Sequence, residues 1–133
     1  MVRAVIAIIA GLGGALIVIL ATEWLGHMLA PSMGAAPGEF ESVAMAGAAL
    51  PLASLVLVLL AYVLGSLAGG WITARIMGDR QWWPSLTVGA MLLLGVIMNL
   101  EAIPHPLWFA VLALVIPLPL ALAGFRLARS LAR

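Results

Sequence analysis

The chain has 133 residues, of which 65% are hydrophobic and 8% are charged, and its formal net charge is +1. With a mean hydropathy of +1.25 it has too little polar surface to form a water-soluble globule, so the composition predicts an integral membrane protein. The lipid bilayer is therefore the first expected partner. The small net charge gives no basis for a nucleic-acid-binding surface, and we expect no nucleic acid as a partner.

Four long uncharged runs follow one another along the chain and leave no room for a separate soluble domain. They cover residues 4–22, 42–74, 81–100 and 102–125. A helix needs about 20 apolar residues to cross the hydrocarbon core, whereas the strands of a membrane barrel have about ten residues of alternating polarity. We therefore predict an all-α integral membrane protein, a bundle of four transmembrane helices in a single domain, 1–133. The expected spans are 4–28, 46–76, 82–103 and 106–128, with an outer loop at 29–45.

The first run imitates a secretory signal peptide, because Arg3 precedes an apolar core. No convincing small-x-small cleavage site follows before Glu23, so we expect this run to be retained as the first span. Four retained spans place the two termini on the same side of the membrane.

All six arginines fall on one side of such a bundle. They are Arg3, Arg75, Arg80, Arg126, Arg129 and Arg133. Because Lys and Arg accumulate in the cytoplasmic segments of polytopic membrane proteins, we expect both termini to be cytoplasmic. A bacterial inner (plasma) membrane is the expected location.

Small residues in the second span stand four apart and so share a helix face. Gly65 pairs in this way with Gly69, and Ser66 pairs with Gly70. Because small residues let helix backbones approach closely in lipid, we expect these four to pack helices, either within the bundle or against a second copy. Asn99 in the third span is expected to face another helix, because an unpaired amide is unfavourable in lipid.

Two glutamates near the outer ends of the first and third spans are each followed four residues later by a histidine. The motif "EWLGH" supplies Glu23 and His27, and "EAIPH" supplies Glu101 and His105. Residues four apart share a helix face, and carboxylates with imidazoles bind divalent ions, so these four residues form a hypothetical metal or proton site. Pro104 weakens the hypothesis, because it is expected to end the helix before His105. The simpler interpretation is that these groups are solvated at the level of the lipid headgroups.

A short repeat links the ends of the second and fourth spans. The segments "GWITAR" and "GFRLAR" share Gly, an aromatic residue, Ala and Arg at matching positions. Together with the two Glu–His pairs, this repeat suggests parallel duplication of a two-helix hairpin. Chance similarity between apolar helices is the alternative.

The sequence contains no cysteine, and it shows no phosphate loop, nucleophile elbow or zinc-protease motif. We therefore expect no enzyme and no cofactor, with a divalent metal as the one candidate ligand. The first expectation for function is a structural or accessory role, as a small oligomer or as a subunit of a larger membrane complex. The alternative is a small transporter, or a membrane protein that binds a divalent ion or a proton through the glutamates and histidines named above.

Overall fold

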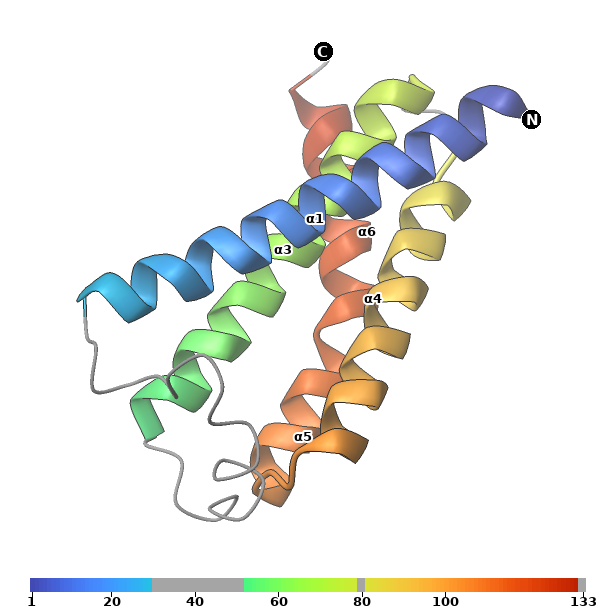
Figure 1. The fold of residues 1–133 in the computed structure, drawn as a ribbon. Coiled ribbons are helices and arrows are strands. Elements are labelled where there is room, and N and C mark those ends of the chain that lie inside the picture. The colour runs from blue at the N-terminus through green and yellow to red at the C-terminus, as the bar shows by residue number, and fades with distance from the viewer. Residues whose placement is uncertain (30–51, 79–80, 132–133) are drawn as a thin grey trace.

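Helices make up nearly all of the described structure, a computed structural model that describes residues 1–29, 52–78 and 81–131 (Figure 1). The helices are α1 (Val2–Leu29), α3 (Leu52–Met77), α4 (Trp83–Ala102), α5 (Leu107–Val115) and α6 (Pro117–Ser130). Four helices are long and apolar enough to cross a membrane, since α5 and α6 together form one span, Leu107–Ser130. The prediction of an all-helical chain with four candidate membrane spans is thus confirmed. Residues 30–45 of the expected outer loop and the first six residues of the expected second span lie outside the described residues.

Local sequence explains where the helices stop. The helix α3 ends at Met77, and Gly78 follows with a φ of 81°, a left-handed conformation that glycine adopts without steric strain. The helix α4 ends at Ala102, because Ile103 precedes Pro104 and takes the extended conformation, with φ −129° and ψ 124°. The predicted effect of Pro104 is therefore present in the structure.

The fourth span contains a local interruption at Ile116, between α5 and α6. Pro117 and Pro119 carry no backbone N–H and so cannot donate to the carbonyl groups four residues earlier. Ile116 nevertheless keeps helical dihedral angles, φ −59° and ψ −48°, and its N–H donates to the Leu112 carbonyl over 3.0 Å. The two helices therefore continue one another as a single span.

The helix α3 lies at the centre of the bundle and packs closely against α1 and α6 through small residues (Figure 1). A methyl group added to Gly65 would approach Ile19 of α1 to 2.5 Å, and one added to Gly69 would approach the Ala15 side chain to 2.9 Å. On the other side of α3, a methyl group on Gly70 would overlap the backbone of Ala121 in α6. In lipid no hydrophobic effect drives helices together. Close backbone contact of this kind therefore supplies much of the packing energy.

The small residues singled out in the sequence all lie inside this packing. Gly65, Ser66, Gly69 and Gly70 are buried, and Ser66 is only 1% exposed. The three glycines among them therefore contact helices of the same chain.

The two copies of the short repeat occupy comparable surroundings. A methyl group on Gly124 of α6 would overlap the backbone of α3 beside Gly70, so the two glycines face each other. In α3 the Arg75 guanidinium lies 5.6 Å from the centre of the Trp71 ring, and in α6 that of Arg129 lies 5.7 Å from the centre of the Phe125 ring. Both copies thus combine a close glycine contact with an arginine over an aromatic ring.

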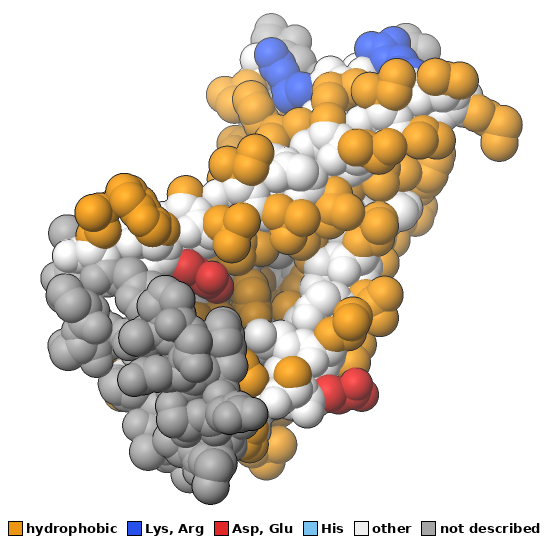
Figure 2. All heavy atoms as spheres, viewed as in Figure 1, with side chains coloured by type: hydrophobic (Ala, Val, Ile, Leu, Met, Phe, Trp, Pro, Cys, Tyr) orange, Lys and Arg blue, Asp and Glu red, His pale blue; other side chains and the backbone are white. Residues whose placement is uncertain are grey.

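Basic side chains gather at one end of the bundle, and the acidic side chains visible in Figure 2 lie away from that end. The described arginines are exposed near the chain termini, at what we call the arginine end: Arg3, Arg75, Arg126 and Arg129. There the Arg3 Nε donates a hydrogen bond of 2.7 Å to the carbonyl of Ile76, which joins the start of α1 to the end of α3. Arg80 and Arg133 lie outside the described residues. The opposite end, with the turn at 103–106, is called the proline-turn end below.

Candidate functional site

A cleft of about 410 Å³ lies between α1, α3 and α4, and α6 contributes one residue to it. Its lining residues from α1 are Leu12, Leu16, Ile19 and Glu23, and those from α3 are Tyr62 and Ser66. The α4 residues are Met91, Leu92, Leu94, Gly95, Val96 and Asn99, and Pro117 comes from α6. We call this cavity the Glu23 cleft. Its volume is within the range of sites that hold small organic molecules.

The cleft exists because α1 follows α3 and departs from α4. Near the arginine end Ala15 of α1 packs with Val88 and Leu92 of α4 in one buried cluster. Beyond that cluster α1 and α4 diverge, as Figure 1 shows, and a hollow is visible between them on the face shown in Figure 2. Gly95 of α4 enlarges the space, because a methyl group added there would meet nothing within 4 Å.

Most of the cleft wall is hydrocarbon. On α1 the lining residues Leu12, Leu16 and Ile19 recur at helical spacing and lead to Glu23 on the same face. On α4 the corresponding face leads from Leu92 through Gly95 and Val96 to Asn99. Each helix thus carries apolar residues toward the arginine end and one polar residue toward the proline-turn end.

Four polar side chains from three helices converge on this otherwise apolar space: Glu23, Tyr62, Ser66 and Asn99. Glu23 of α1 and Tyr62 of α3 line the same cavity. Tyr62 and Ser66 stand four apart and so share one face of α3. These groups give the cleft an acidic and hydrogen-bonding end and an apolar remainder.

Two of these polar groups lack protein partners for their side chains. Within residues 1–29, 52–78 and 81–131, neither the Ser66 hydroxyl nor the Asn99 amide forms a hydrogen bond, although Ser66 is 1% exposed. Leaving a buried polar group without a hydrogen bond costs about 1–3 kcal/mol. A ligand or water molecule in the cleft would supply a hydrogen-bond partner to the buried Ser66 hydroxyl and to the half-buried Asn99 amide.

Of the three predicted metal-site residues whose side chains are described, only Glu23 lines this cleft. Glu23 lines it, whereas Glu101 is exposed at the end of α4 and is not among the lining residues. His27 lies in α1, but its side chain is outside the described part of the structure. Among the side chains that are described, no three of His, Asp and Glu come close enough together to hold a metal ion. The four-residue metal site stays a prediction.

His105 has a local structural role in the turn that follows α4. Its Nδ1–H donates to the carbonyl of Ile103 over 2.6 Å, since a carbonyl oxygen can only accept. Its ring stacks on Phe109 with centroids 4.6 Å apart and planes 12° apart. Phe109 is completely buried in a cluster with Leu55 of α3 and Val96 of α4. These contacts hold the turn against the bundle.

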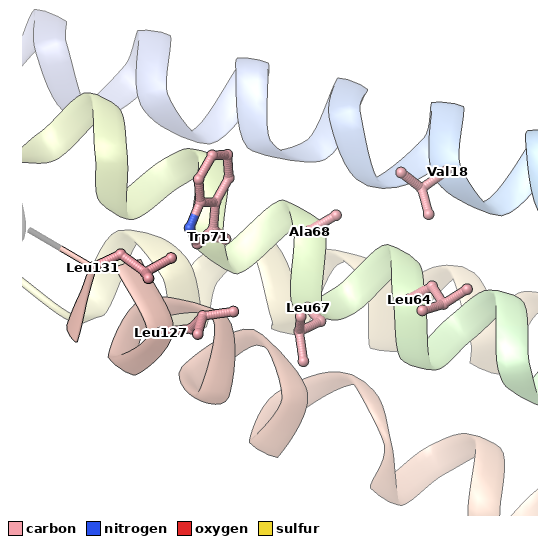
Figure 3. Close-up of a pocket in the computed structure, with 7 residues that line it drawn as sticks. All are labelled: Val18, Leu64, Leu67, Ala68, Trp71, Leu127 and Leu131. Atoms are coloured by element: carbon pink, nitrogen blue, oxygen red, sulfur yellow. The ribbon is translucent and has the colours of Figure 1, made fainter. Parts of the chain in front are cut away.

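Two further grooves are almost wholly apolar. One, of about 420 Å³, lies along α3 between α1 and α6, as Figure 3 shows, and is lined by Val18, Leu64, Leu67, Ala68, Trp71, Leu127 and Leu131. The other, of about 430 Å³, lies between α1 and α3, and its Thr22 hydroxyl already donates to the Val18 carbonyl of the same helix. The Trp71 indole N–H is the polar side-chain group at the first groove, and neither groove has an acidic or basic residue among its described lining, so both suit lipid chains.

The Glu23 cleft has to be interpreted from its own chemistry. No protein-family model, curated protein or solved structure matches this chain.

The sequence did not identify the cleft, although it contained signals of it. Tyr62 is the chain's one tyrosine and lies within an uncharged run, four residues before Ser66. A hydroxyl pair at this spacing in a membrane span indicates a polar face turned toward another helix or a cavity. Ser66 was assigned to helix packing, and the structure shows it both buried and lining the cleft.

Proposed function

We propose that this protein is a small polytopic membrane protein that binds an amphipathic small molecule in the Glu23 cleft. This develops the transporter or ion-binding alternative from the sequence, with Glu23 and Asn99 in place of the two Glu–His pairs. The observation that supports it is the convergence of polar groups from α1, α3 and α4 on one apolar cavity. Cavities that combine apolar walls with a few convergent polar groups are typical ligand sites.

A photoreactive probe tests this proposal. The full-length protein in lipid nanodiscs is exposed to an alkyl-diazirine alcohol, irradiated and analysed by mass spectrometry. We expect labelling to concentrate on cleft residues such as Met91 and Leu94. The variant Gly95→Phe fills the cleft from a position with open space around it, and it is expected to lose this labelling.

Labelling at Leu64, in the groove of Figure 3, provides the control, because Gly95→Phe does not touch that groove. Equal labelling of the cleft and of the apolar grooves, unchanged in Gly95→Phe, would count against the proposal.

A structural or accessory role, in a small oligomer or a larger membrane complex, is the second candidate function. It is supported by the large apolar side chains exposed along α1, among them Ile9, Ile17 and Leu20, which can contact lipid or the helix of a partner. Purification in a mild detergent followed by native mass spectrometry tests this role. A defined oligomer or a retained partner would support it, and a monodisperse monomer would count against it.

The arginine end is proposed to face the cytoplasm of a bacterial inner membrane. The segregation of the described arginines toward one end of the bundle supports this orientation. Parallel duplication of a hairpin is also a proposal. Its support is the facing pair Gly70 and Gly124, together with the matched arginine–aromatic contacts of α3 and α6.

A further inference from the structure

We propose that the ligand of the Glu23 cleft carries an uncharged carbonyl group, such as that of an ester or a ketone, whose oxygen accepts a hydrogen bond from the Ser66 hydroxyl. This inference rests on the proposed function and names the class of ligand for the same cleft. The Ser66 hydroxyl, its depth in the bundle and the space beside it support the assignment.

The Ser66 hydroxyl has a proton that no protein group accepts. Five other hydroxyl side chains of the helices donate to backbone carbonyl groups: Thr22, Thr73, Ser85, Thr87 and Ser130. Thr73, about two turns further along α3, donates over 2.7 Å to the Gly69 carbonyl of its own helix. Among the described residues nothing accepts from Ser66, which is 1% exposed and lines the cleft. The unused proton is therefore available to a molecule inside the cleft.

The depth of Ser66 favours an acceptor without a charge. Ser66 lies 14 residues after the start of α3 at Leu52 and 11 residues before its end at Met77. At the helical rise this leaves about 16 Å of helix between Ser66 and the nearer end. Since α3 is a candidate membrane span, this position falls near the middle of a hydrocarbon core about 30 Å thick. A carboxylate or phosphate loses its hydration there at a large cost, whereas a carbonyl oxygen carries no charge.

A carbonyl group suits the Ser66 hydroxyl better than an alcohol does. A hydroxyl has one proton to donate and lone pairs that accept, whereas a carbonyl oxygen only accepts. When a carbonyl binds Ser66, the one proton of the pair has an acceptor. An alcohol would bring a second proton, which needs a further acceptor. Because a buried donor without an acceptor is unfavourable, we expect the cleft to select the carbonyl.

The volume of the cleft favours an organic ligand over a lone water molecule. A water molecule takes up about 30 Å³ of liquid volume and needs about two to four polar partners. The cleft measures about 410 Å³, and most of its lining residues are Leu, Ile, Val, Met or Pro. A molecule with a hydrocarbon body and a carbonyl group would fill the apolar part of the cleft and also supply the acceptor.

A series of photoreactive probes tests the carbonyl assignment. Alkyl-diazirine alcohols with a ketone at successive carbons are compared with a reference that has methylene groups throughout. The full-length protein is held in nanodiscs of ether-linked phosphatidylcholine, a lipid without a carbonyl group. Labelling of Met91 and Leu94 is divided by labelling of Leu64 in the groove of Figure 3, which corrects for the amount of probe in the membrane. We expect the ratio for the best ketone to exceed that of the reference by about fivefold, the effect of one hydrogen bond.

The variant Ser66→Ala is expected to bring the best ketone and the reference within about twofold of each other, since it removes the donor. Thr73→Val is the matched control and should keep the preference, because Thr73 is buried in the same helix, does not line the cleft and already donates to Gly69. Without a probe, Ser66→Ala should melt no lower than the wild type, because it breaks no hydrogen bond. A marked fall would mean that the hydroxyl already has a partner and would count against the proposal.

An ester group of a membrane lipid and a free lipid-soluble carbonyl compound share this chemistry. Nanodiscs of ester-linked and ether-linked phosphatidylcholine separate the two sources. Weaker labelling by the ketone in ester-linked discs would identify the lipid ester as the ligand. Equal labelling in the two kinds of disc would identify the free carbonyl compound.

Equal ratios for every ketone and the reference in the wild-type protein would overturn the carbonyl inference and leave the proposed function standing. A preference for the ketone that persists in Ser66→Ala would overturn it as well. Absence of cleft labelling by all of the probes would instead overturn the proposed function itself. The comparison of probes on the wild-type protein decides the question even if Ser66→Ala does not fold.

Discussion

The Ser85 hydroxyl of α4 donates a hydrogen bond of 3.0 Å to the backbone carbonyl of Gly70 in α3. Both residues are buried, and Gly70 is also the point at which α3 meets α6. Gly70 thus contacts two other helices, α4 through its carbonyl and α6 through the side of its backbone that lacks a side chain. This junction fixes α4 against α3 on one side of the cleft.

Replacing Ser85 by alanine removes this bond between helices. We expect Ser85→Ala to lower the free energy of unfolding by about 0.6 kcal/mol and by at most about 1.7 kcal/mol, as for other hydrogen bonds between membrane helices. Unfolding in mixed detergent micelles, followed by circular dichroism, measures the change. Thr87→Ala is the control, because the Thr87 hydroxyl donates within its own helix to the Trp83 carbonyl. An equal loss in both variants would contradict a specific role for the bond.

The contact between α3 and α6 depends on the absence of side chains at two glycines. A methyl group at Gly70 would overlap Ala121, and one at Gly124 would overlap the carbonyl of Leu67, so backbone would have to move in both cases. We expect Gly70→Ala and Gly124→Ala each to destabilise the bundle by about 1–3 kcal/mol, the usual cost of overpacking. Gly13→Ala should cause no loss, because the added methyl group meets nothing within 4 Å. Similar melting temperatures for all three variants would refute this packing.

The orientation of the bundle can be measured with single cysteines, since the chain has none of its own. Ser130→Cys lies at the arginine end, and Glu101→Cys lies at the end of α4. In intact bacterial cells we expect a membrane-impermeant maleimide to label Glu101→Cys and to label Ser130→Cys only after lysis. The reverse pattern would place the arginine end outside.

A divalent metal is expected to leave the melting temperature unchanged. Glu23 lines the cleft and Glu101 does not, and no three metal-ligating side chains come together among those that the structure describes. A metal bound to the folded protein at 100 times its dissociation constant would add about 2.7 kcal/mol of stability. Thermal unfolding with and without Zn²⁺ measures this. A rise in the wild type that disappears in Glu23→Gln would restore the metal hypothesis.

Composition and chain-breaking residues were enough to predict the helical class. Uncharged runs of sufficient length predicted four candidate spans, because a bilayer demands length and apolarity. Pro104 predicted the end of α4, because the residue before a proline avoids the helical conformation. Span length, apolarity and the effect of a proline on the residue before it are all set by residues adjacent in the sequence.

The cleft depends on how helices diverge, and the sequence does not encode that locally. Small residues along α3 predicted close contacts, but which helix meets Gly65 and which meets Gly70 follows from three-dimensional packing. The matching spacing of the two Glu–His motifs was therefore the one basis for predicting that Glu23 and Glu101 share a site. The structure shows that Glu23 shares a cavity with Asn99, a pairing that spacing did not predict, because α1 departs from α4 beyond the cluster at Ala15.

The most direct test of the Glu23 cleft as a binding site compares two cysteines at similar distances from the starts of their helices, 11 residues in α1 and 12 in α4. Gly95→Cys in α4 projects into the cleft, and Gly13→Cys in α1 lies outside it, each with nothing within 4 Å of its Cβ. In nanodiscs an uncharged N-alkyl maleimide should modify Gly95→Cys at least about tenfold faster than Gly13→Cys, because binding in the cleft holds the reagent beside the thiol. Equal rates at the two cysteines would contradict the account.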